Sequence, residues 1–187
     1  KREDLKLVIG DITMPVAVED KIDYIIHCAS ITTSKIMISR PVDVIRTSLN
    51  GTENLLELAK EKQVRSMVYV SSMEMYGVLN LQDDQMVTEE MTGYLNPLAL
   101  RSNYPESKRM CENMCVAYGT QYEVPVKIAR LAQTFGAGVL PGENRVFAQF
   151  ARSAMKGSDI VLHTEGKSEG NYCYTADAVR ALLTILV

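Results

Sequence analysis

A tyrosine and a lysine one helical turn apart are the residues of this chain best suited to acid–base chemistry. Tyr104 and Lys108 lie in the stretch SNYPESKRMCEN, and on a helix this spacing puts both side chains on one face. A tyrosine hydroxyl has an ordinary pKa of about 10, and a neighbouring ammonium group lowers it toward the neutral range. The pair could therefore take a proton from a hydroxyl group. Because the chain has nine tyrosines, a Tyr and a Lys at this spacing can also occur by chance. The alternative is an amphipathic helix with a solvent-facing lysine.

A second group of polar residues follows an apolar run. The segment VYVSSMEMYG (68–77) ends in Ser71 and Ser72, with Glu74 two positions on. Ser72 could donate a hydrogen bond to the substrate oxygen whose proton Tyr104 takes, which would hold that oxygen while a hydride moves. Glu74 could carry a second proton, and a solvated loop acid is the alternative for this residue alone.

The elements that must position these groups follow from the apolar pattern. Short, nearly continuous apolar runs at 5–11, 23–30, 64–72 and 124–136 are typical of strands covered on both faces. Segments of helical period come between and after them, over about 103–118 and 145–155 and from about Pro41 and Asp177. This alternation predicts an α/β fold with a doubly wound parallel sheet.

Two details of this pattern matter for the site. On the predicted helix that begins near Pro41, the residues expected to be buried are Val42, Ile45, Leu49, Leu56 and Ala59. On the predicted helix 103–118 they are Met110, Met114 and Ala117. The polar, turn-rich stretch 77–100 follows a predicted strand. Because ligands bind at the carboxyl ends of strands in such sheets, we expect this stretch to border an active site.

Composition excludes several classes of partner. The 187 residues are 47% hydrophobic and 23% charged with a net charge of −3, which indicates a soluble globular domain and no nucleic acid partner. Apolar stretches fall short of the roughly 18 residues that span a bilayer, and no signal peptide is visible, so we expect a cytoplasmic protein without a membrane partner. Four cysteines without a CxxC pair and two histidines predict reduced thiols and no metal site.

The order and spacing of Ser72, Tyr104 and Lys108 resemble the Ser/Thr–Tyr–Lys triad of the extended short-chain dehydrogenases/reductases. Other segments, in order, resemble further motifs of that family. They are GDI (10–12), IIHCAS (25–30), SLNGTENLLELA (48–59), RSNYPESKRMCE (101–112), IARLAQTFGAG (128–138), RVFAQFARSAMKG (145–157) and YCYTADAVRALL (172–183). The resemblance covers nearly the whole chain and looks nearest to nucleotide-sugar 4,6-dehydratases and UDP-glucuronate decarboxylases of the NAD-dependent epimerase/dehydratase family.

The resemblance implies a Rossmann-like fold and a mechanism. NAD, with NADP as an open alternative, takes a hydride from C4 of a nucleotide-linked sugar while Tyr104 removes the hydroxyl proton. Ser72 positions the oxygen, and Lys108 holds the nicotinamide ribose and lowers the pKa of Tyr104. The 4-keto sugar then epimerises, dehydrates or decarboxylates. Glu74 stands where dehydratases and decarboxylases carry a catalytic glutamate.

The same resemblance implies binding residues and a partner. The residues that would line the cofactor, besides Tyr104 and Lys108, are Asp11, Ile12, Ala29, Ser30, Asn50 and Ser71. Gln133 and Arg145 would contact the substrate. Relatives pair as homodimers through the helices that here begin near Pro41 and Asn103, packed as a four-helix bundle.

The chain also departs from the family pattern. None of its eleven glycines forms the glycine-rich loop, so the first βαβ unit is lacking. We therefore expect residues 1–140 to be a partial dinucleotide-binding domain and 141–187 to begin a substrate-binding portion interleaved with its sheet. Met73 replaces a polar residue, Gln133 an asparagine, and Gly170 an arginine that grips the diphosphate, for which Arg145 or Lys167 could compensate.

These departures keep other functions open. The first hypothesis is an NAD-dependent nucleotide-sugar epimerase, dehydratase or decarboxylase. The alternatives are a non-enzymatic NAD(P)-binding or redox-sensing module, and a reductase of another small carbonyl compound. Retention of Ser72, Tyr104 and Lys108 together favours the enzyme, because a non-catalytic protein has no physical need for that set.

Overall fold

The structure is a computed structural model that describes residues 2–82, 84–140, 142–162, 164–167 and 169–187. Its chain divides into two compact units, Lys1–Arg130 with Ile185–Val187, and Leu131–Thr184. The elements that begin in the first unit are β1 (Tyr24–His27), α1 (Ser34–Ser39), α2 (Pro41–Lys62), β2 (Ser66–Ser72), the 3-10 turns Met73–Tyr76 and Leu100–Ser102, α3 (Asn103–Tyr122) and β3 (Val126–Leu131). The elements that begin in the second are β4 (Gln133–Phe135), α4 (Val146–Lys156), β5 (Tyr172–Tyr174) and α5 (Thr175–Leu186).

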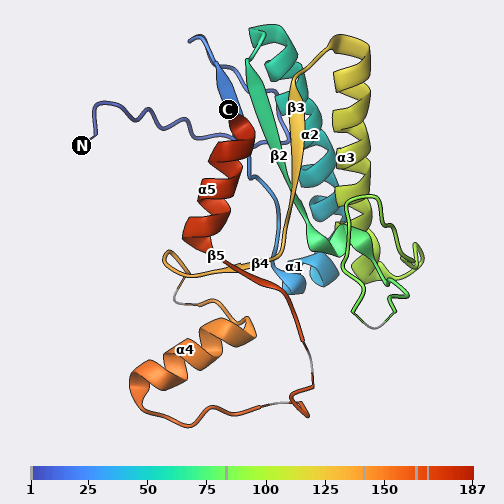
Figure 1. Cartoon of the computed structure of the whole chain (residues 1–187). Helices are drawn as coiled ribbons and strands as arrows, with labels where there is room; N and C mark the ends of the chain where they lie inside the picture. The colour runs from blue at the N-terminus through green and yellow to red at the C-terminus, as the bar shows by residue number, and fades with distance from the viewer. Residues whose placement is uncertain (1, 83, 141, 163, 168) are drawn as a thin grey trace. The chain divides into compact units, whose positions relative to one another are not determined.

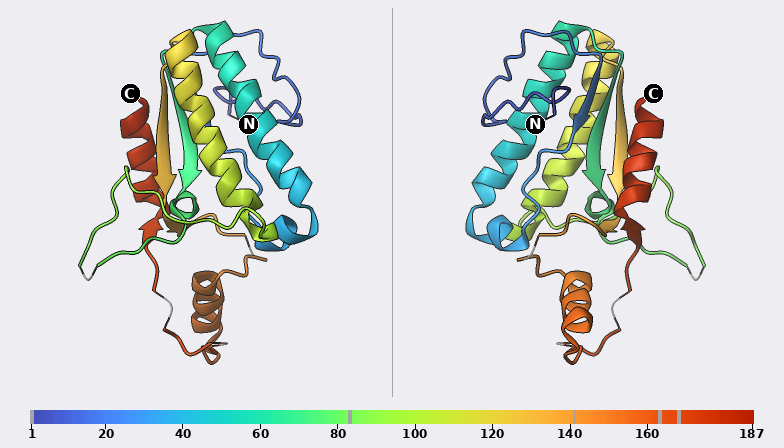
Figure 2. Two further views of the ribbon diagram at one scale, coloured as in Figure 1. Left: turned by 90° about the vertical axis from the view of Figure 1, so that its right-hand side faces the viewer. Right: turned by 90° about the vertical axis from the view of Figure 1, so that its left-hand side faces the viewer.

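The first unit is built on a three-stranded sheet in the order β1-β2-β3. β1 and β2 are parallel, with Tyr24 opposite Ser66 and His27 opposite Tyr69, and the three arrows point the same way in Figure 2. α2 and α3 lie side by side on one face of this sheet (Figures 1 and 2). A parallel sheet with flanking helices is the Rossmann-like arrangement, so the predicted fold class is confirmed.

The core lies between the sheet and the two long helices. β2 is its central strand, and its first four residues are all buried. The buried cluster consists of Leu56, Ala59, Val64, Met67, Tyr69, Cys111, Cys115 and Val124. Pro41 stands at the start of α2, where its missing N–H costs no hydrogen bond, and Gln63 closes the helix in the left-handed conformation. α2 and α3 are thus fixed along their length, and so are the side chains they carry toward the end of β2.

Two of the predicted strands differ in the structure. Residues 5–11 form no strand, and Leu7 and Ile9 are 80% and 90% exposed, because the segment has no neighbouring strand among the described residues to bond with. The run 124–136 forms two strands, β3 and β4. β4 leaves the first sheet and pairs with β5, so one apolar run supplies both sheets.

The buried stripes predicted on the two helices are only partly correct. Leu56 and Ala59 are buried. Val42, Ile45 and Met110 are instead 54%, 38% and 49% exposed, and Ala117 is exposed as well. These helices carry apolar residues on a wider arc than the sheet can cover, so part of their apolar surface faces outward.

The second unit is small. β4 and β5 are parallel, with Gln133 opposite Tyr172 and Phe135 opposite Tyr174. Phe135 packs edge-on against Tyr172 and Tyr174 and also contacts Phe147 of α4. Aromatic contacts of this kind join α4 to the two short strands. In the part of the chain that the structure describes, no helix has both the length and the apolar character needed to cross a bilayer.

A buried histidine makes the stability of the first unit depend on pH. His27 is 2% exposed, and its Nε2 lies 3.1 Å from Thr52 Oγ1. Burial, with a smaller contribution from the charge of Lys108, lowers the pKa of His27 from 6.5 to about 4. Below pH 6.5 the unfolded chain therefore binds a proton that the folded chain excludes.

We expect the free energy of unfolding to fall by about 3 kcal/mol as the pH drops from about 7 to about 4. Urea unfolding across this range measures it. His27→Gln removes the titrating group, so this variant should be less stable at neutral pH but should show a shallower pH dependence. An equal slope in both proteins would assign the effect to carboxylates instead.

Candidate active site

Ser72 ends β2 and begins the 3-10 turn that carries Glu74. Its Oγ accepts a hydrogen bond from the backbone N–H of Glu74 at 3.2 Å, which caps the turn. A hydroxyl group has one donor and two acceptor positions. The cap uses an acceptor position, so the Ser72 O–H can still donate to an oxygen at the end of the strand.

Tyr104 and Lys108 stand on the face of α3 that meets this strand end. Both side chains are buried, at 6% and 4% exposure. Lys108 Nζ donates to Val70 O at 2.8 Å and lies 5.7 Å from the centroid of the Tyr104 ring. The Val70 carbonyl is only two residues from Ser72, so the structure gathers Ser72, Tyr104 and Lys108 at one place.

The charge state of this pair differs from the expectation drawn from the sequence. Burial raises the pKa of Tyr104, the charge of Glu74 raises it further, and a hydrogen-bond contribution from Ser72 and the charge of Arg101 lower it. The net direction is upward because burial is the largest effect on Tyr104. That Lys108 lowers the Tyr104 pKa when the cofactor is bound stays a prediction. Burial also lowers the pKa of Lys108, and it dominates because both groups lie in the core.

Glu74 is half-exposed and paired with an arginine that the sequence analysis did not single out. Arg101 Nη2 donates to both carboxylate oxygens of Glu74, at 3.1 and 2.9 Å. The guanidinium carbon of Arg101 lies 5.8 Å from the centroid of the Tyr104 ring. A carboxylate and a guanidinium group therefore stand together beside Tyr104, at the end of β2.

A buried ion pair between Glu112 and Arg130 holds the end of β2 through Ser71. Ser71 Oγ donates to Glu112 Oε1 at 2.5 Å, and Arg130 contacts both oxygens of Glu112, with its shortest bond at 2.8 Å. Their side chains are 19% exposed for Arg130 and 9% for Glu112. The bond to Glu112 raises the pKa of Arg130, so this arginine stays charged. Glu112 of α3 thus joins β2 and β3 at Ser71, the residue before the candidate catalytic Ser72.

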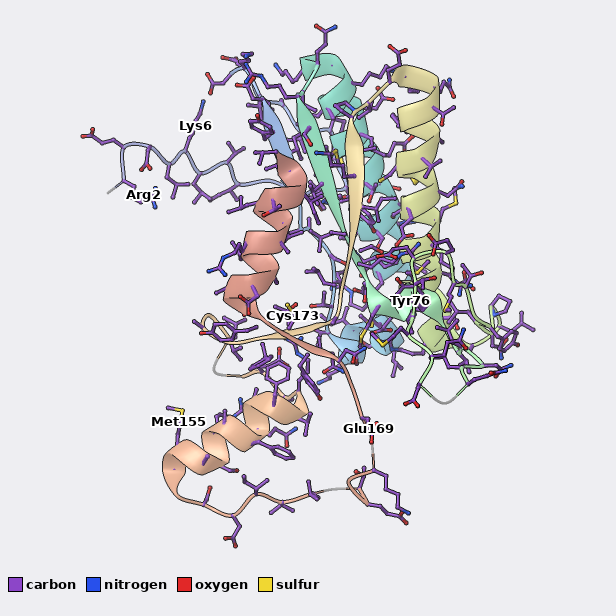
Figure 3. The ribbon with its side chains drawn as sticks, in the orientation of Figure 1. Arg2, Lys6, Tyr76, Met155, Glu169 and Cys173 are labelled. Carbon is purple, nitrogen blue, oxygen red and sulfur yellow. The ribbon has the colours of Figure 1, made fainter. Side chains whose placement is uncertain are left out.

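Arginine side chains also hold the loop that follows the strand. Arg109 donates from Nε to Met75 O and from Nη2 to Gly93 O, both at 2.7 Å. Arg130 Nη1 donates to Glu89 O at 2.6 Å, and the guanidinium carbon lies 4.9 Å from the ring centroid of Tyr76, which Figure 3 labels beyond the end of β2. Met75, Tyr76, Glu89 and Gly93 are thereby tied to α3 and β3, so the predicted border of the site is anchored at these four positions.

The residues expected beside the cofactor form two groups. Asp11 accepts hydrogen bonds from the backbone N–H and hydroxyl of Thr13, both at 2.9 Å, and these bonds lower the pKa of its exposed carboxyl group. Asn54 donates to Ile12 O at 2.9 Å, and a Cβ on Gly51 would lie 3.1 Å from the Ile12 side chain. The NGTEN stretch of α2 therefore anchors the 10–12 turn through Gly51 and Asn54.

The second group follows β1 and lies on α2. Ala29 and Asn50 are exposed, and Ser30 is half-buried. The Oγ atom of Ser30 makes no hydrogen bond of standard geometry among the described residues, but it lies close enough to Tyr104 to help lower the pKa of that residue. Ser71 is buried and its hydroxyl group donates to Glu112, so only its backbone atoms are available to contact a cofactor.

The expected substrate residues belong to the second unit. Gln133 lines a cavity of about 450 Å³ whose other walls include Gln149 and Phe150 of α4, Val161, Leu162 and Tyr172. Arg145 precedes α4, pairs with Glu143 at 2.7 Å and lies over the Phe147 ring. Lys167 pairs with Glu165, as Arg145 pairs with Glu143, and Gly170 is exposed and has no side chain with which to hold a phosphate.

Comparison with known proteins decides the family. The model of the NAD dependent epimerase/dehydratase family matches residues 1–187. The chain belongs to this family. UDP-glucuronic acid decarboxylase 6 of Arabidopsis thaliana is 32% identical over 184 residues, which cover 97% of this chain and 51% of the plant protein. UDP-glucuronic acid decarboxylase 1 of Xenopus tropicalis is 31% identical over 98% of this chain and 42% of that protein.

Solved structures agree with this assignment. The UDP-glucose 4-epimerase of Thermus thermophilus in complex with NAD is 26% identical, with a TM-score of 0.74, over 88% of this chain and 53% of the epimerase. The chain thus spans about half the length of these family members. Its Rossmann-like sheet and the gathered Ser72, Tyr104 and Lys108 are what the epimerase/dehydratase family pattern implies.

Family motifs also contained residues whose roles the sequence analysis missed. Glu112 is the last residue of the segment RSNYPESKRMCE (101–112), and Arg130 is the third residue of the segment IARLAQTFGAG (128–138). The sequence showed both residues within family-like segments, but it did not show that they contact each other. Arg101 begins the same segment as Glu112, but 27 positions separate it from Glu74 and no local pattern connects the two.

Proposed function

We propose that the protein containing this chain is an NAD-dependent enzyme that acts on a nucleotide-linked sugar through a 4-keto intermediate. The observation that carries the proposal is the gathering of Ser72, Tyr104 and Lys108 at the carboxyl end of β2, in a member of the epimerase/dehydratase family. Ligands of parallel α/β sheets bind at this end of the strands. The relatives named above support the same class of reaction.

The proposed chemistry assigns one task to each side chain. Tyr104 takes the proton of the C4 hydroxyl group and later returns it, and the Ser72 O–H donates to the same oxygen. Lys108 places a positive charge 5.7 Å from the centroid of the Tyr104 ring, where it stabilises the phenolate that forms. Glu74 is near enough to the strand end to carry a second proton, at the carbon next to the ketone.

The chain's residues fit NAD at this place. Ser30 Oγ is a buried hydroxyl close to Tyr104 that makes no hydrogen bond of standard geometry among the described residues, and Lys108 is a buried ammonium group bonded to one carbonyl. Such groups suit the hydroxyls of a ribose. We assign Lys108 and Tyr104 to the nicotinamide ribose, Ala29, Ser30, Asn50 and Ser71 to the cofactor walls, and Asp11 and Ile12 to the adenine end. When bound, NAD accepts and returns the hydride, and NADP remains an alternative that the assay below compares.

We assign the cavity beside Gln133 to the nucleotide part of the substrate. Its walls combine apolar side chains, which suit a base, with the amides of Gln133 and Gln149, which can donate and accept hydrogen bonds. Arg145 carries the nearby positive charge expected for a diphosphate. We propose that residues 1–140 are a partial dinucleotide-binding domain, of which Gln133 also lines the substrate cavity, and that 141–187 begin a substrate-binding portion interleaved with its sheet.

Glu74 narrows the choice among family reactions. By the family resemblance it occupies the position at which dehydratases and decarboxylases carry a catalytic glutamate and simple 4-epimerases usually do not. Two relatives above are named UDP-glucuronic acid decarboxylases. We therefore propose a decarboxylase or dehydratase in preference to a simple epimerase.

Incubation of the full-length protein with NAD or NADP and a panel of UDP-, dTDP-, GDP- and CDP-sugars tests the function, with products followed by mass spectrometry. Loss of carbon dioxide or of water is the expected result. An unchanged mass with an altered sugar would show an epimerase. Binding of NAD without conversion of any sugar would contradict the proposal and favour the sensor module or a reductase of another carbonyl compound.

We also propose a homodimer formed by α2 and α3. These helices and residues 97–100 line an open groove of about 680 Å³, and its apolar walls include Val42, Ile45, Leu98 and Met110. Apolar side chains at helical spacing on two adjacent helices suit the same pair of helices from a second copy. The resemblance to dimeric relatives supports this occupant.

Ile45→Lys places a charge in this groove in both copies, so we expect at least roughly 10²-fold weaker association because the charge must be desolvated. Light scattering over a dilution series measures the association. Met155→Lys, at a side chain 87% exposed on α4 and labelled in Figure 3, is the control and should leave the dimer intact. A wild-type protein that is monomeric at micromolar concentration would contradict the dimer.

A further inference from the structure

Arg101 stands at the candidate active site without a structural task that accounts for it. It lies in the 3-10 turn Leu100–Ser102, three residues before Tyr104, with 38% of its side chain exposed. Glu74, with which it forms an ion pair, has a similarly exposed side chain, at 39%. Half-exposed pairs of this kind contribute at most about 1 kcal/mol to stability, so folding alone gives little reason for the pair to lie here.

The hydrogen bonds of Arg101 leave most of its donors available. Both bonds to Glu74 come from Nη2. Among the described residues no acceptor bonds to Nε or Nη1, so at least three N–H groups remain. A guanidinium group can hold one carboxylate on one edge and a second on another edge, because its donors form a rigid planar fork.

The chemistry of the sugar places a second carboxylate within reach. If Tyr104 takes the proton from the C4 hydroxyl group, the substituent on C5 lies one carbon further along the ring, close to Tyr104. Arg101 lies over the Tyr104 ring, 5.8 Å from its centroid. In a uronic acid the C5 substituent is a carboxylate, whereas in a neutral hexose it is a hydroxymethyl group.

We propose that Arg101 is a specificity-determining residue whose guanidinium group binds the C5 carboxylate of a nucleotide-linked uronic acid. This inference rests on the proposed function and adds the class of sugar. Glu74 alone would repel a carboxylate at this place, and Arg101 offsets that charge. The same positive charge acts on Tyr104, whose pKa Glu74 raises and Arg101 lowers. The Glu74–Arg101 pair therefore admits an anionic sugar while keeping Glu74 beside the reacting carbons.

The test compares two sugars that differ only at C5. In full-length protein carrying Tyr104→Phe, which blocks turnover, calorimetry with NAD present measures the Kd of UDP-glucuronate, UDP-glucose and UDP. Arg101→Gln should weaken UDP-glucuronate by roughly 10- to 100-fold, the effect of one charge-assisted contact, and should change UDP-glucose and UDP by less than about 3-fold. Arg101→Lys keeps the charge but not the planar fork, so it should weaken UDP-glucuronate by less than Arg101→Gln does and leave UDP-glucose and UDP nearly unchanged.

Arg65→Gln is the matched control. Arg65, like Arg101, forms an ion pair with a carboxylate, 3.1 Å from Asp23. It immediately precedes the first residue of β2, whereas the candidate site lies at the last. It should leave all three Kd values unchanged. Unchanged NAD binding shows that each variant is folded.

The outcomes separate the inference from the proposed function. Equal weakening of both sugars by Arg101→Gln would mean that Arg101 only orients Glu74 and would overturn the inference, while the enzyme assignment stands. Unchanged affinities would overturn it in the same way. If Arg101→Gln fails to bind NAD, Arg101→Lys decides, and equal weakening of UDP-glucuronate and UDP-glucose in that variant would also overturn the inference. A wild-type protein that converts no nucleotide sugar would remove the proposed function and the inference together.

Discussion

Tyr104→Phe is expected to reduce turnover of the nucleotide sugar by roughly 10²- to 10⁴-fold while NAD binding is retained. The substitution removes only the hydroxyl group. The ring stays packed against Met37 and Val44, so the fold and the cofactor walls should not change. Steady-state turnover and calorimetric NAD binding on the full-length protein measure the two effects separately.

Tyr118→Phe provides the same chemical change on the same helix. The Tyr118 hydroxyl group donates to Glu57 at 2.7 Å on the exposed side of α3. Its removal should leave turnover within about 2-fold of wild type, because exposed hydrogen bonds of this kind contribute little. Full activity in Tyr104→Phe would show that another group moves the proton.

Glu112→Gln is expected to lower the free energy of unfolding by about 3 kcal/mol, because it leaves the charge of Arg130 without its carboxylate. Ser71 would lose its charged acceptor at the same time, so the end of β2 should loosen and turnover should fall with stability. Urea unfolding measures the first effect and turnover at low temperature the second.

Two further variants locate the cause of that loss. Arg130→Met added to Glu112→Gln removes the unpaired charge, so the double variant should be more stable than the sum of the two single changes predicts. Glu57→Gln changes an exposed carboxylate paired with Lys60 and should cost less than about 1 kcal/mol. A loss below about 1 kcal/mol in Glu112→Gln would contradict a structural role for the buried pair.

The parts of the fold that sequence could predict are those with local signals. α2, α3, α4 and α5 each begin within a few residues of the position that apolar spacing predicted. The Tyr104–Lys108 pair is a local spacing on one helix, and Ser72 ends a strand that apolarity alone identifies. Local features of this kind need no knowledge of what packs against them.

Burial was harder to predict because it depends on partners. Periodicity identified Val42, Ile45 and Met110 as apolar positions but could not show that the sheet leaves them uncovered. Residues 5–11 have the composition of a strand, yet a strand forms only beside another strand. In both cases the local pattern is correct and the missing information is the neighbour.

The electrostatics of the site were unpredictable for the same reason. The sequence suggested that Lys108 would lower the pKa of Tyr104, but burial of the hydroxyl group is the larger effect and raises it. Glu74 and Arg101 meet across a turn-rich stretch without periodicity, so no spacing rule connects them. The contact of Glu112 with Arg130 likewise joins a helix to a strand that follows it.

Rapid mixing of the NAD-loaded full-length protein with UDP-glucuronate tests the central claim, that this site removes a hydride at C4 with Tyr104 as the base. The absorbance of reduced nicotinamide is followed during a single turnover. We predict that reduced nicotinamide forms before product in the wild-type protein and does not form in Tyr104→Phe. Formation of product without reduced nicotinamide, or equally fast reduction in Tyr104→Phe, would contradict the account.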